Sequence, residues 1–379
     1  MKVLQICAAY KPAYVYGGPT MSVSMLSEKL IKAGIYTEVY TTTANGKNEL
    51  PVLPGCTVNV DGVGVTYFKR ITKDHTHLSP ALLKKLWTSV RQFDIVHIHA
   101  WWNLVSIFSC IIALIRRVPV LISARGTLSP YSFQNKNKNI KLLIHNMLSR
   151  SLLKRCHFHV TSNREYEAIA SVVTPKSITD LPNFVRLPVN DHAASAKHSN
   201  KFKLIFLSRI EEKKGLDILI NVLPLLSFSY NLTIAGDGDI DYINDLKERA
   251  KKYEIDKNIT WVGFQNDNKF KLLSEHDLLV LPSFDENFGN VVIESLSEGT
   301  AVLVSKFVGL SGYVTENNLG WDCELNVQSV GNMINLIQGK QDELKRIRSD
   351  APSRIRADFN EDSLIKRYIE MYKSISNNG

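Results

Sequence analysis

The stretch Leu281-Pro-Ser-Phe-Asp-Glu-Asn-Phe-Gly-Asn-Val-Val-Ile-Glu294 decides how the rest of the chain is interpreted. A mostly apolar run from Asp277 to Leu281 leads into it and predicts a buried parallel strand that stops at the next proline. After a polar loop, Asn290 opens a segment with apolar residues at helical spacing. Such a strand, loop and helix start usually hold an anionic ligand. Glu286 lies in the loop and Glu294 about a turn into the helix, where acids also serve as ordinary partners of the helix dipole.

The composition is that of an ordinary globular protein, with 44% hydrophobic and 22% charged residues in 379. This length predicts two domains, each able to bury its own core. The five cysteines are scattered and never form a Cys-x-x-Cys pair, which indicates a reducing compartment and argues against a zinc site or a disulfide framework. The first residues do not predict a signal peptide, and the longest apolar stretch, 104–115, is too short to span a membrane. We therefore expect a cytoplasmic protein.

Charge is spread unevenly along the chain. Residues 1–190 carry 23 Lys and Arg against 9 Asp and Glu, a net charge of +14, whereas residues 191–379 carry a net charge of −5. A basic half suggests an anionic partner, although a solvated basic surface stays open as the simpler interpretation. No motif or aromatic-interleaved patch predicts nucleic-acid binding. An acceptor on a lipid pyrophosphate, or peripheral attachment to the inner face of the cytoplasmic membrane, fits better. The candidate contact residues are Lys136, Lys138, Lys141, Arg150, Lys154 and Arg155.

Strand-like and helix-like segments alternate through most of the chain, which predicts parallel sheets with right-handed crossovers. The pattern breaks at 187–200, where a polar, proline-containing stretch predicts a linker. The predicted fold class is therefore α/β, with two doubly wound domains at residues 1–187 and 188–361 and a cleft between them. A helix at about 362–379 has an apolar stripe, and we expect it to pack back on the first domain.

Motifs of the second half resemble those of one enzyme family. The segment from Glu286 to Glu294 resembles the Glu-x7-Glu element of retaining glycosyltransferases of the GT-B fold, in the family 4 that includes bacterial polysaccharide and lipopolysaccharide enzymes. The segment 206–216 is similar to the Arg…Lys-Gly segment of that family, with Arg209 at a strand end and Lys214 directly before a glycine. The resemblance implies two Rossmann-like domains and a nucleotide-sugar donor.

The resemblance also implies roles for these residues. Arg209 and Lys214 would neutralise the leaving phosphate, the first by a forked contact and the second as a point charge. Glu286 would orient the sugar, and Glu294 would hold the ribose hydroxyls. The further donor-binding residues implied are Gly263, Asn287, Phe288, Gly289 and Asn290.

Three motifs of the first half have counterparts in the same family. Gly17-Gly18 looks like its glycine loop, although a glycine pair is also a simple turn signal. His97 and His99 point to the same side of a strand. In similar enzymes the second histidine, here His99, reaches the donor sugar, and we interpret His97 as supporting structure. Arg125 lies in a segment that resembles one from a polysaccharide branch of the family, so it is a candidate acceptor-binding residue or a structural surface arginine.

The function implied is retaining transfer of a hexose-type sugar from a nucleotide-diphosphate donor to a hydroxyl of a lipid-linked glycan in cell-surface polysaccharide synthesis. Neither a metal nor another cofactor is expected, because Asp237-Gly-Asp239 lies in a strand–glycine loop–helix context that predicts a turn. Three alternatives stay open: a GT-B-fold sugar-nucleotide epimerase, a non-catalytic scaffold or binding partner in a glycan assembly complex, and a periplasmic sugar-binding protein.

Overall fold

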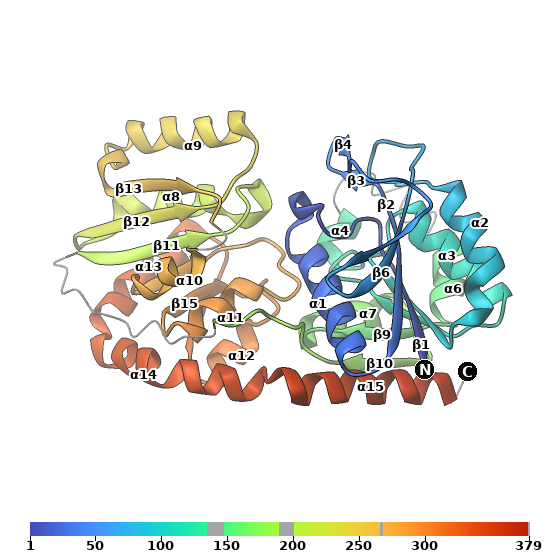
Figure 1. The fold of residues 1–379 in the computed structure, drawn as a ribbon. Helices are drawn as coiled ribbons and strands as arrows, with labels where there is room; N and C mark the ends of the chain where they lie inside the picture. The colour runs from blue at the N-terminus through green and yellow to red at the C-terminus, as the bar shows by residue number, and fades with distance from the viewer. Residues whose placement is uncertain (135–147, 189–200, 266–267, 378–379) are drawn as a thin grey trace. The chain divides into compact units, whose positions relative to one another are not determined.

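The computed structural model describes residues 1–134, 148–188, 201–265 and 268–377 (Figure 1). The chain divides into two compact units, residues 1–184 together with 361–379, and residues 185–360. Each unit contains a largely parallel sheet with helices packed on it. The predicted fold class, α/β with two Rossmann-like domains, is therefore confirmed.

The sheet of the first unit has the strand order β10-β9-β8-β7-β1-β2-β6-β5. Seven of its strands are parallel and the edge strand β5 (Thr57–Val60) is antiparallel. The parallel strands are β1 (Lys2–Ile6), β2 (Tyr36–Thr42), β6 (Val63–Phe68), β7 (Ile95–His99), β8 (Val120–Ser123), β9 (His157–Val160) and β10 (Ser177–Asp180). A small hairpin of β3 (Ala44–Asn45) and β4 (Asn48–Glu49) lies outside this sheet. The strand order reverses between β1 and β7, so the loops after these two strands diverge there, as at the ligand crevice of other doubly wound sheets.

Seven α-helices of the described residues belong to the first unit. They are α1 (Gly18–Lys32), α2 (Pro80–Ser89), α3 (Leu104–Ile115), α4 (Pro130–Gln134), α6 (Arg150–Leu153), α7 (Asn163–Val172) and α15 (Glu361–Asn377). The last of these comes from the far end of the chain and runs along the first unit (Figure 1). Its buried side chains pack against residues of β1, α1, β7 and β8, and they are Leu364, Tyr368, Met371, Tyr372 and Ile375.

The sheet of the second unit is wholly parallel, in the order β13-β12-β11-β14-β15-β16. Its strands are β11 (Phe202–Leu207), β12 (Tyr230–Ala235), β13 (Ile259–Gly263), β14 (Leu278–Leu281), β15 (Ala301–Ser305) and β16 (Gly320–Cys323). All four residues of β14 are buried, as expected for a central strand of a parallel sheet covered on both faces. The order reverses between β11 and β14, which places the switch point of this sheet at the loops after those two strands.

The helices of the second unit follow its strands in alternation. They are the 3₁₀ turn η4 (Glu212–Lys214) and the α-helices α8 (Leu216–Val222), α9 (Ile240–Lys252), α10 (Lys269–Ser274), α11 (Asn290–Ser297), α12 (Ser311–Glu316), α13 (Val327–Gly339) and α14 (Gln341–Asp358). Most of the predicted linker, residues 189–200, lies outside the described residues.

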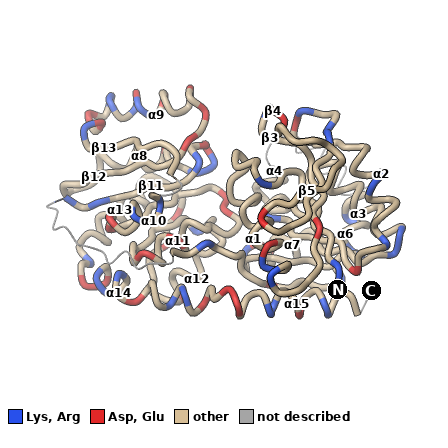
Figure 2. The backbone as a smooth tube through the Cα atoms, in the orientation of Figure 1, with Lys and Arg blue, Asp and Glu red and all other residues tan. Residues whose placement is uncertain are grey.

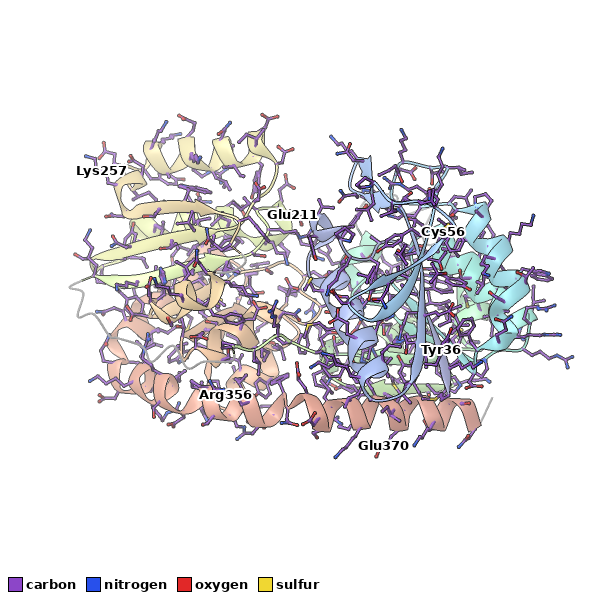
Figure 3. All side chains as sticks on the ribbon, viewed as in Figure 1. Tyr36, Cys56, Glu211, Lys257, Arg356 and Glu370 are labelled. Atoms are coloured by element: carbon purple, nitrogen blue, oxygen red, sulfur yellow. The ribbon has the colours of Figure 1, made fainter. Side chains whose placement is uncertain are left out.

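Two general expectations from the sequence can be compared with the structure. All five cysteines are free; Cys56 is exposed and the other four are buried (Figure 3). Within the described ranges, no helix combines the length and the apolar character needed to cross a membrane.

Candidate active site

The switch point of the second sheet is built by two loops in contact. The backbone N–H of Phe284, in the loop after β14, donates to the carbonyl of Lys213 at 2.9 Å. Gly215 makes this approach possible, because its φ is +70° and an added Cβ would lie 1.9 Å from the carbonyl oxygen of Pro282. The residue before it, Lys214, is thereby held at the carboxyl end of β14.

Two consecutive lysines pair with two consecutive carboxylates across these loops. The ammonium of Lys213 lies 2.9 Å from a carboxylate oxygen of Asp285, and Lys214 forms an ion pair with Glu286. The Asp285 side chain is only 3% exposed. A buried carboxylate without its cation would be strongly destabilising, so the Lys213–Asp285 pair supports the loops structurally. Sequence reasoning named Lys214 and Glu286 but missed Lys213 and Asp285.

The loop that carries Glu286 is also fixed from its other side. The N–H of Glu286 donates to the carbonyl of Phe307 at 3.1 Å, and its own carbonyl accepts from Gly309 at 2.8 Å. Gly289 then opens α11 with φ +94°, where an added Cβ would meet a methyl of Val308 at 3.1 Å. The loop after β15 therefore holds the predicted Glu-x7-Glu segment in place.

The other donor-binding residues predicted in this segment differ in their surroundings. The side chain of Phe288 is buried and packs edge to face on Phe359, so only its backbone faces the loop. Asn287 and Asn290 are partly exposed. Glu294 accepts a hydrogen bond from Lys269 at 2.7 Å, a partner that the sequence did not indicate.

Arg209 and Gly263 follow or end two strands of the same sheet, β11 and β13, which are separated by β12. Arg209 follows β11 and pairs with Glu211, which is labelled in Figure 3, and its side chain is 48% exposed. Gly263 ends β13 with φ +69°, and its carbonyl accepts from Gly236 at 2.9 Å. The four cations along this edge, Arg209, Lys213, Lys214 and Lys269, are thus each paired with a carboxylate.

The Asp237-Gly-Asp239 segment forms a turn and a helix cap. Asp239 caps α9 by accepting from the N–H groups of Asp241 and Tyr242 at 3.1 and 3.3 Å, and Asp237 accepts from Gly238 at 2.8 Å. In the part of the chain that the structure describes, no group of three or more His, Cys, Asp or Glu side chains is arranged to hold a metal ion. Metal independence of the reaction stays a prediction.

The predicted residues of the first unit lie in or beside the connections that follow β1, β7 and β8. Gly17 has φ +64° and caps α1, Gly18 is the first residue of that helix, and an added Cβ on Gly18 would meet no atom within 4 Å. Beyond His99, the last residue of β7, Ala100 has φ +66°; Arg125, just beyond β8, has φ +51°. Left-handed backbone is costly for residues other than glycine and is concentrated at functional sites.

His99 is buried with both ring nitrogens engaged inside the first unit. Its Nδ1 accepts from Arg125 Nε at 3.2 Å, and its Nε2 donates to Gln5 Oε1 at 2.6 Å. Burial, with the neighbouring His97 and Arg125, holds the pKa of His99 well below its ordinary value, so the ring is neutral. A ring contact with a donor sugar would require exchange of one of these bonds; that contact stays a prediction.

Arg125 is partly buried and held by neutral groups. Besides His99, its guanidinium donates to Asn183 Oδ1 at 3.1 Å. No carboxylate among the described residues forms an ion pair with it, and burial lowers the pKa of Arg125. The carboxylate of Glu165 instead accepts from the N–H groups of Gly126 and Thr161 at 3.1 and 3.0 Å. Among the described residues, the hydrogen-bond partners of the Arg125 guanidinium are therefore neutral.

Comparison with known proteins identifies the family. A model of the group 1 glycosyl transferases matches residues 190–354, and a model of glycosyltransferase family 4 matches residues 16–187. The chain belongs to the GT-B glycosyltransferases of group 1. This glycosyltransferase is 25% identical to an uncharacterised glycosyltransferase of Methanocaldococcus jannaschii over 98% of each chain. It is 22% identical to an uncharacterised 41.2 kDa protein in the cps region of Klebsiella pneumoniae, over 93% of this chain and 100% of that protein.

Its fold is shared with solved structures. Anabaena HepE, crystallised in complex with UDP and glucose, matches 99% of the glycosyltransferase and 100% of its own chain with a TM-score of 0.76 at 18% identity. The family predicted from the sequence motifs is therefore confirmed, and so is the GT-B fold. Retention at the anomeric carbon and the polysaccharide branch stay predictions.

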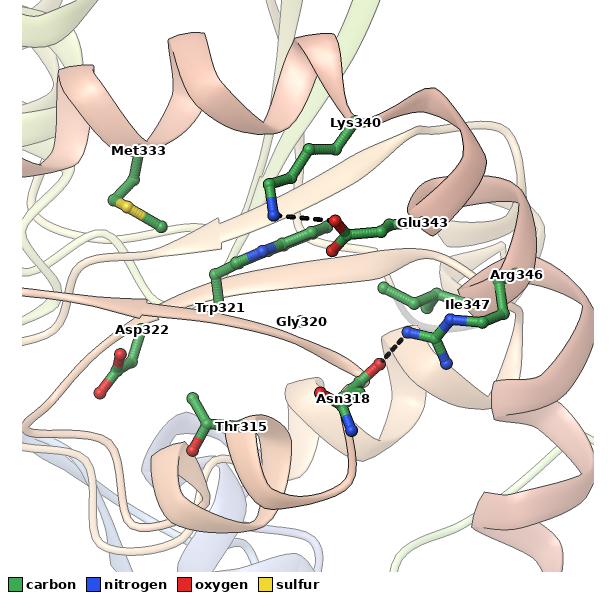
Figure 4. Close-up of a pocket in the computed structure, with 10 residues that line it drawn as sticks. All are labelled: Thr315, Asn318, Gly320, Trp321, Asp322, Met333, Lys340, Glu343, Arg346 and Ile347. Atoms are coloured by element: carbon green, nitrogen blue, oxygen red, sulfur yellow. Dashed lines mark hydrogen bonds and ion pairs between the residues drawn. The ribbon is translucent and has the colours of Figure 1, made fainter.

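The glycosyltransferase also has a cavity of about 290 Å³ in its second unit (Figure 4). Its lining residues come from β16 and helices α12, α13 and α14 or lie beside them, and none of them is a predicted site residue: Thr315, Asn318, Gly320, Trp321, Asp322, Met333, Lys340, Glu343, Arg346 and Ile347. Lys340 pairs with Glu343 at 2.8 Å and Arg346 donates to the carbonyl of Asn318 at 2.7 Å. These cations already have partners, so we assign the cavity no role.

Proposed function

We propose that this glycosyltransferase moves a sugar from a nucleotide-diphosphate donor to a hydroxyl of a glycan acceptor, with retention at the anomeric carbon and without a divalent ion. The observation that supports this proposal is the row of cations at the carboxyl edge of the second sheet, with Arg209 and Lys214 at its switch point. Negative charge grows on the leaving diphosphate as its bond to the sugar breaks, and prearranged cations lower the energy of that state.

In the proposed mechanism the cations exchange partners. The donor phosphates compete with Glu286 for the ammonium of Lys214, and with Glu211 for the half-exposed guanidinium of Arg209. The carboxylate of Glu286 is then free to accept hydrogen bonds from sugar hydroxyls. Backbone N–H groups at the start of α11 add partial positive charge on the same side.

The proposed chemical step assigns a role to each of these groups. The bond between the anomeric carbon and the phosphate oxygen breaks, and the acceptor oxygen attacks the same face of the sugar. The proton of the acceptor hydroxyl passes to the leaving phosphate oxygen. Glu286 orients the sugar in this scheme and forms no covalent bond to it, and Glu294 holds the ribose hydroxyls after exchanging its bond with Lys269.

A uridine nucleotide is the first donor to test, because HepE was crystallised with UDP and glucose. In a thermal-shift titration, a ligand present at 100 times its dissociation constant stabilises the folded protein by about 2.7 kcal/mol. We expect UDP or UDP-glucose to raise the melting temperature, with GDP and ADP as comparisons. Absence of a shift with every nucleoside diphosphate and its sugars would contradict the proposed donor class.

Substitution separates a catalytic role from a structural one. Arg209→Ala and Lys214→Ala should each lower donor turnover by roughly 10²- to 10³-fold, the range for loss of one stabilising donor. Turnover is measured as nucleoside diphosphate released from the sugar nucleotide that gives the largest thermal shift. Lys251→Ala is the matched control, because Lys251 is 62% exposed on α9 and its ion-pair partner is Glu248. Near wild-type turnover in both Arg209→Ala and Lys214→Ala would refute the leaving-group assignment.

We further propose that the acceptor is a lipid-linked glycan of cell-surface polysaccharide synthesis, reached from an anionic membrane surface. The net charge of +14 on residues 1–190 supports this, as does similarity to a protein of the Klebsiella cps region. Of the predicted contact residues, Arg150, Lys154 and Arg155 are exposed at α6, whereas Lys136, Lys138 and Lys141 lie outside the described residues. By comparison, α9 and α14 of the second unit carry both signs of charge (Figure 2).

Exposed apolar side chains on two helices of the first unit suit the same partner. Trp87 on α2 is 44% exposed, and Phe108 and Ile115 on α3 are 39% and 59% exposed. The guanidinium of Arg116 lies 5.2 Å from the centre of the Trp87 ring. Aromatic rings beside basic groups are typical of surfaces that attach to the headgroup region of a bilayer.

A further inference from the structure

A continuous chain of hydrogen bonds crosses the carboxyl edge of the first sheet. Its successive pairs are Arg125 Nε–His99 Nδ1 (3.2 Å), His99 Nε2–Gln5 Oε1 (2.6 Å), Gln5 Nε2–Tyr372 OH (3.2 Å), Tyr372 OH–His97 Nδ1 (2.7 Å), His97 Nε2–Ser123 Oγ (2.7 Å), Ser123 Oγ–His159 Nδ1 (2.6 Å) and His159 Nε2–Leu181 O (2.9 Å). The side chains between the two ends are at most 2% exposed. Strands β1, β7, β8 and β9 supply all of them except Tyr372, which comes from α15.

The two ends of this chain fix its direction. A guanidinium can only donate, so His99 Nδ1 must be an acceptor and the proton of His99 must be on Nε2. The carbonyl of Leu181 can only accept, which places the proton of His159 on Nε2 as well. Between them, Tyr372 accepts from Gln5 and donates to His97. One arrangement of protons therefore satisfies every bond, and it requires three neutral histidines with the same tautomer.

Arg125 is the end of this series of hydrogen bonds that could bind a ligand. Its backbone is left-handed, at φ +51°, and its guanidinium is held by two hydrogen bonds, from Nε to His99 and from Nη1 to Asn183. With no carboxylate among the described residues in ion-pair contact, the guanidinium keeps a charge that a ligand can use. The Arg125 Nε–H can donate to His99 only while His99 Nδ1 carries no proton. A residue that favours this tautomer of His99 therefore helps to hold the guanidinium in place.

We propose that Tyr372 is a positioning residue for Arg125 in the transfer reaction, acting through Gln5 and His99. This role rests on the proposed function, in which Arg125 contacts acceptor or donor oxygens. Without the Tyr372 hydroxyl, the Gln5 amide N–H loses its acceptor, and among the described residues only the bond to His99 Nε2 still opposes a turn of the amide. A turned amide presents N–H to His99 Nε2 and favours the tautomer with its proton on Nδ1, which then opposes the N–H of Arg125. The carboxyl-terminal helix α15 thereby supplies a residue that positions Arg125.

Nuclear magnetic resonance can test this chain of hydrogen bonds, which we call the relay, without any substrate. In the full chain with ¹⁵N-labelled histidine and arginine at pH 7.5, the ring nitrogens of His97, His99 and His159 should all report a proton on Nε2. Tyr372→Phe should shift the His97 and His99 signals and make solvent exchange of the Arg125 Nε–H about fivefold faster, the size expected for loss of one hydrogen bond. Tyr40→Phe is the matched control, because among the described residues its buried hydroxyl bonds only Ser89, which takes no part in this series of hydrogen bonds.

A second variant keeps the relay testable if Tyr372→Phe does not fold. Gln5→Met removes both amide contacts, so it should also speed solvent exchange of the Arg125 Nε–H. In the double variant with Tyr372→Phe, this exchange should be no faster than in the faster single variant, because both substitutions break the same series of hydrogen bonds. Additive effects, a His99 proton on Nδ1 in the wild type, or unchanged Arg125 exchange in both variants would overturn the relay.

Kinetics distinguishes the relay from the site assignment. We expect Tyr372→Phe to lower kcat/KM for the sugar nucleotide about fivefold, and Arg125→Ala to lower it more. If Arg125→Ala leaves kcat/KM unchanged, the assignment of Arg125 to the site fails and the positioning role falls with it. If Arg125→Ala is impaired while Tyr372→Phe matches Tyr40→Phe, only the relay fails.

Discussion

Acidification should destabilise the first unit through three histidines that are buried in the neutral form. His97 and His159 have no exposed surface and His99 is 2% exposed. Burial, followed by neighbouring histidines and Arg125, holds the pKa of His97 and of His99 well below 6.5. Burial first and Arg125 second lower the pKa of His159 to about 3. None of the three takes up a proton in the folded protein between pH 7.5 and 5.5.

The unfolded chain behaves differently in the same window. There each histidine titrates near pH 6.5, so the unfolded state binds more protons and gains free energy as the pH falls. The stabilisation is fully present above the unfolded pKa and is lost as the pH drops below it towards the folded values. Between pH 7.5 and 5.5 each histidine costs about 1.4 kcal/mol, so the three together cost about 4 kcal/mol. That is a large share of the stability of an ordinary domain, about 5–15 kcal/mol.

The cysteine, the two tyrosines and the arginine around the cluster do not change protonation in this window. Burial raises the pKa of Cys7 to about 12, and it raises the pKa values of Tyr368 and Tyr372 as well. The guanidinium of Arg125 stays charged throughout. Burial also lowers the pKa of His77, to about 4, and that of His157, so these two histidines of the first unit add to the proton uptake of the three on unfolding.

The assay is urea unfolding at pH 7.5 and 5.5. Unfolding of the first unit is monitored by deuterium exchange of the peptides that cover β7 and β8. His159→Gln should reduce the difference in unfolding free energy between the two pH values by about 1.4 kcal/mol, because the contribution of one histidine is removed. His75→Gln is the control, since that side chain is exposed and should leave the difference unchanged. A difference below about 1 kcal/mol in the wild type would refute the assignment of neutral, buried histidines.

Three further predictions concern the loops, the metal and the membrane. Gly215→Ala should destabilise the second unit by at least about 2 kcal/mol in urea unfolding, because the new Cβ would lie 1.9 Å from a carbonyl oxygen. Gly339→Ala is the control and should not destabilise it, because its Cβ would meet no atom within 4 Å. Sugar transfer should survive EDTA; complete loss that magnesium or manganese restores would reverse the metal-independent assignment. Charge reversal at Arg150, Lys154 and Arg155 should weaken binding to anionic liposomes at low salt and leave donor binding unchanged, since exposed charges are screened within about 10 Å at 0.1 M. Equal binding of the unaltered protein to neutral and anionic liposomes would contradict the membrane proposal.

Much of the fold was predictable from local patterns. The run that forms β14 is apolar at every position from 278 to 281, and a run of that kind bounded by proline predicts a buried parallel strand. Lys214 was distinguishable from Lys213 because it directly precedes Gly215, and the contact of that glycine with Pro282 explains why the order matters.

Partners across the sequence were not predictable in the same way. The pairing of Lys213 with Asp285 depends on how closely two loops approach, and spacing along the chain does not encode that distance. Likewise, the pattern of His97 and His99 predicted one shared face of a strand. It could not show that Gln5 and Tyr372, from opposite ends of the chain, occupy their ring nitrogens.

The two switch points differ in how their positive charge is balanced. In the second unit Lys214 is already paired with Glu286, so a phosphate must displace a carboxylate to reach it. Such an exchange becomes more favourable as the phosphate gains charge, and it therefore favours the transition state over the bound donor, as catalysis requires. In the first unit Arg125 is held by a neutral histidine and an amide, so no charged partner has to leave before a ligand binds. Loss of Lys214 should therefore appear mainly in kcat, whereas loss of Arg125 should appear mainly in KM.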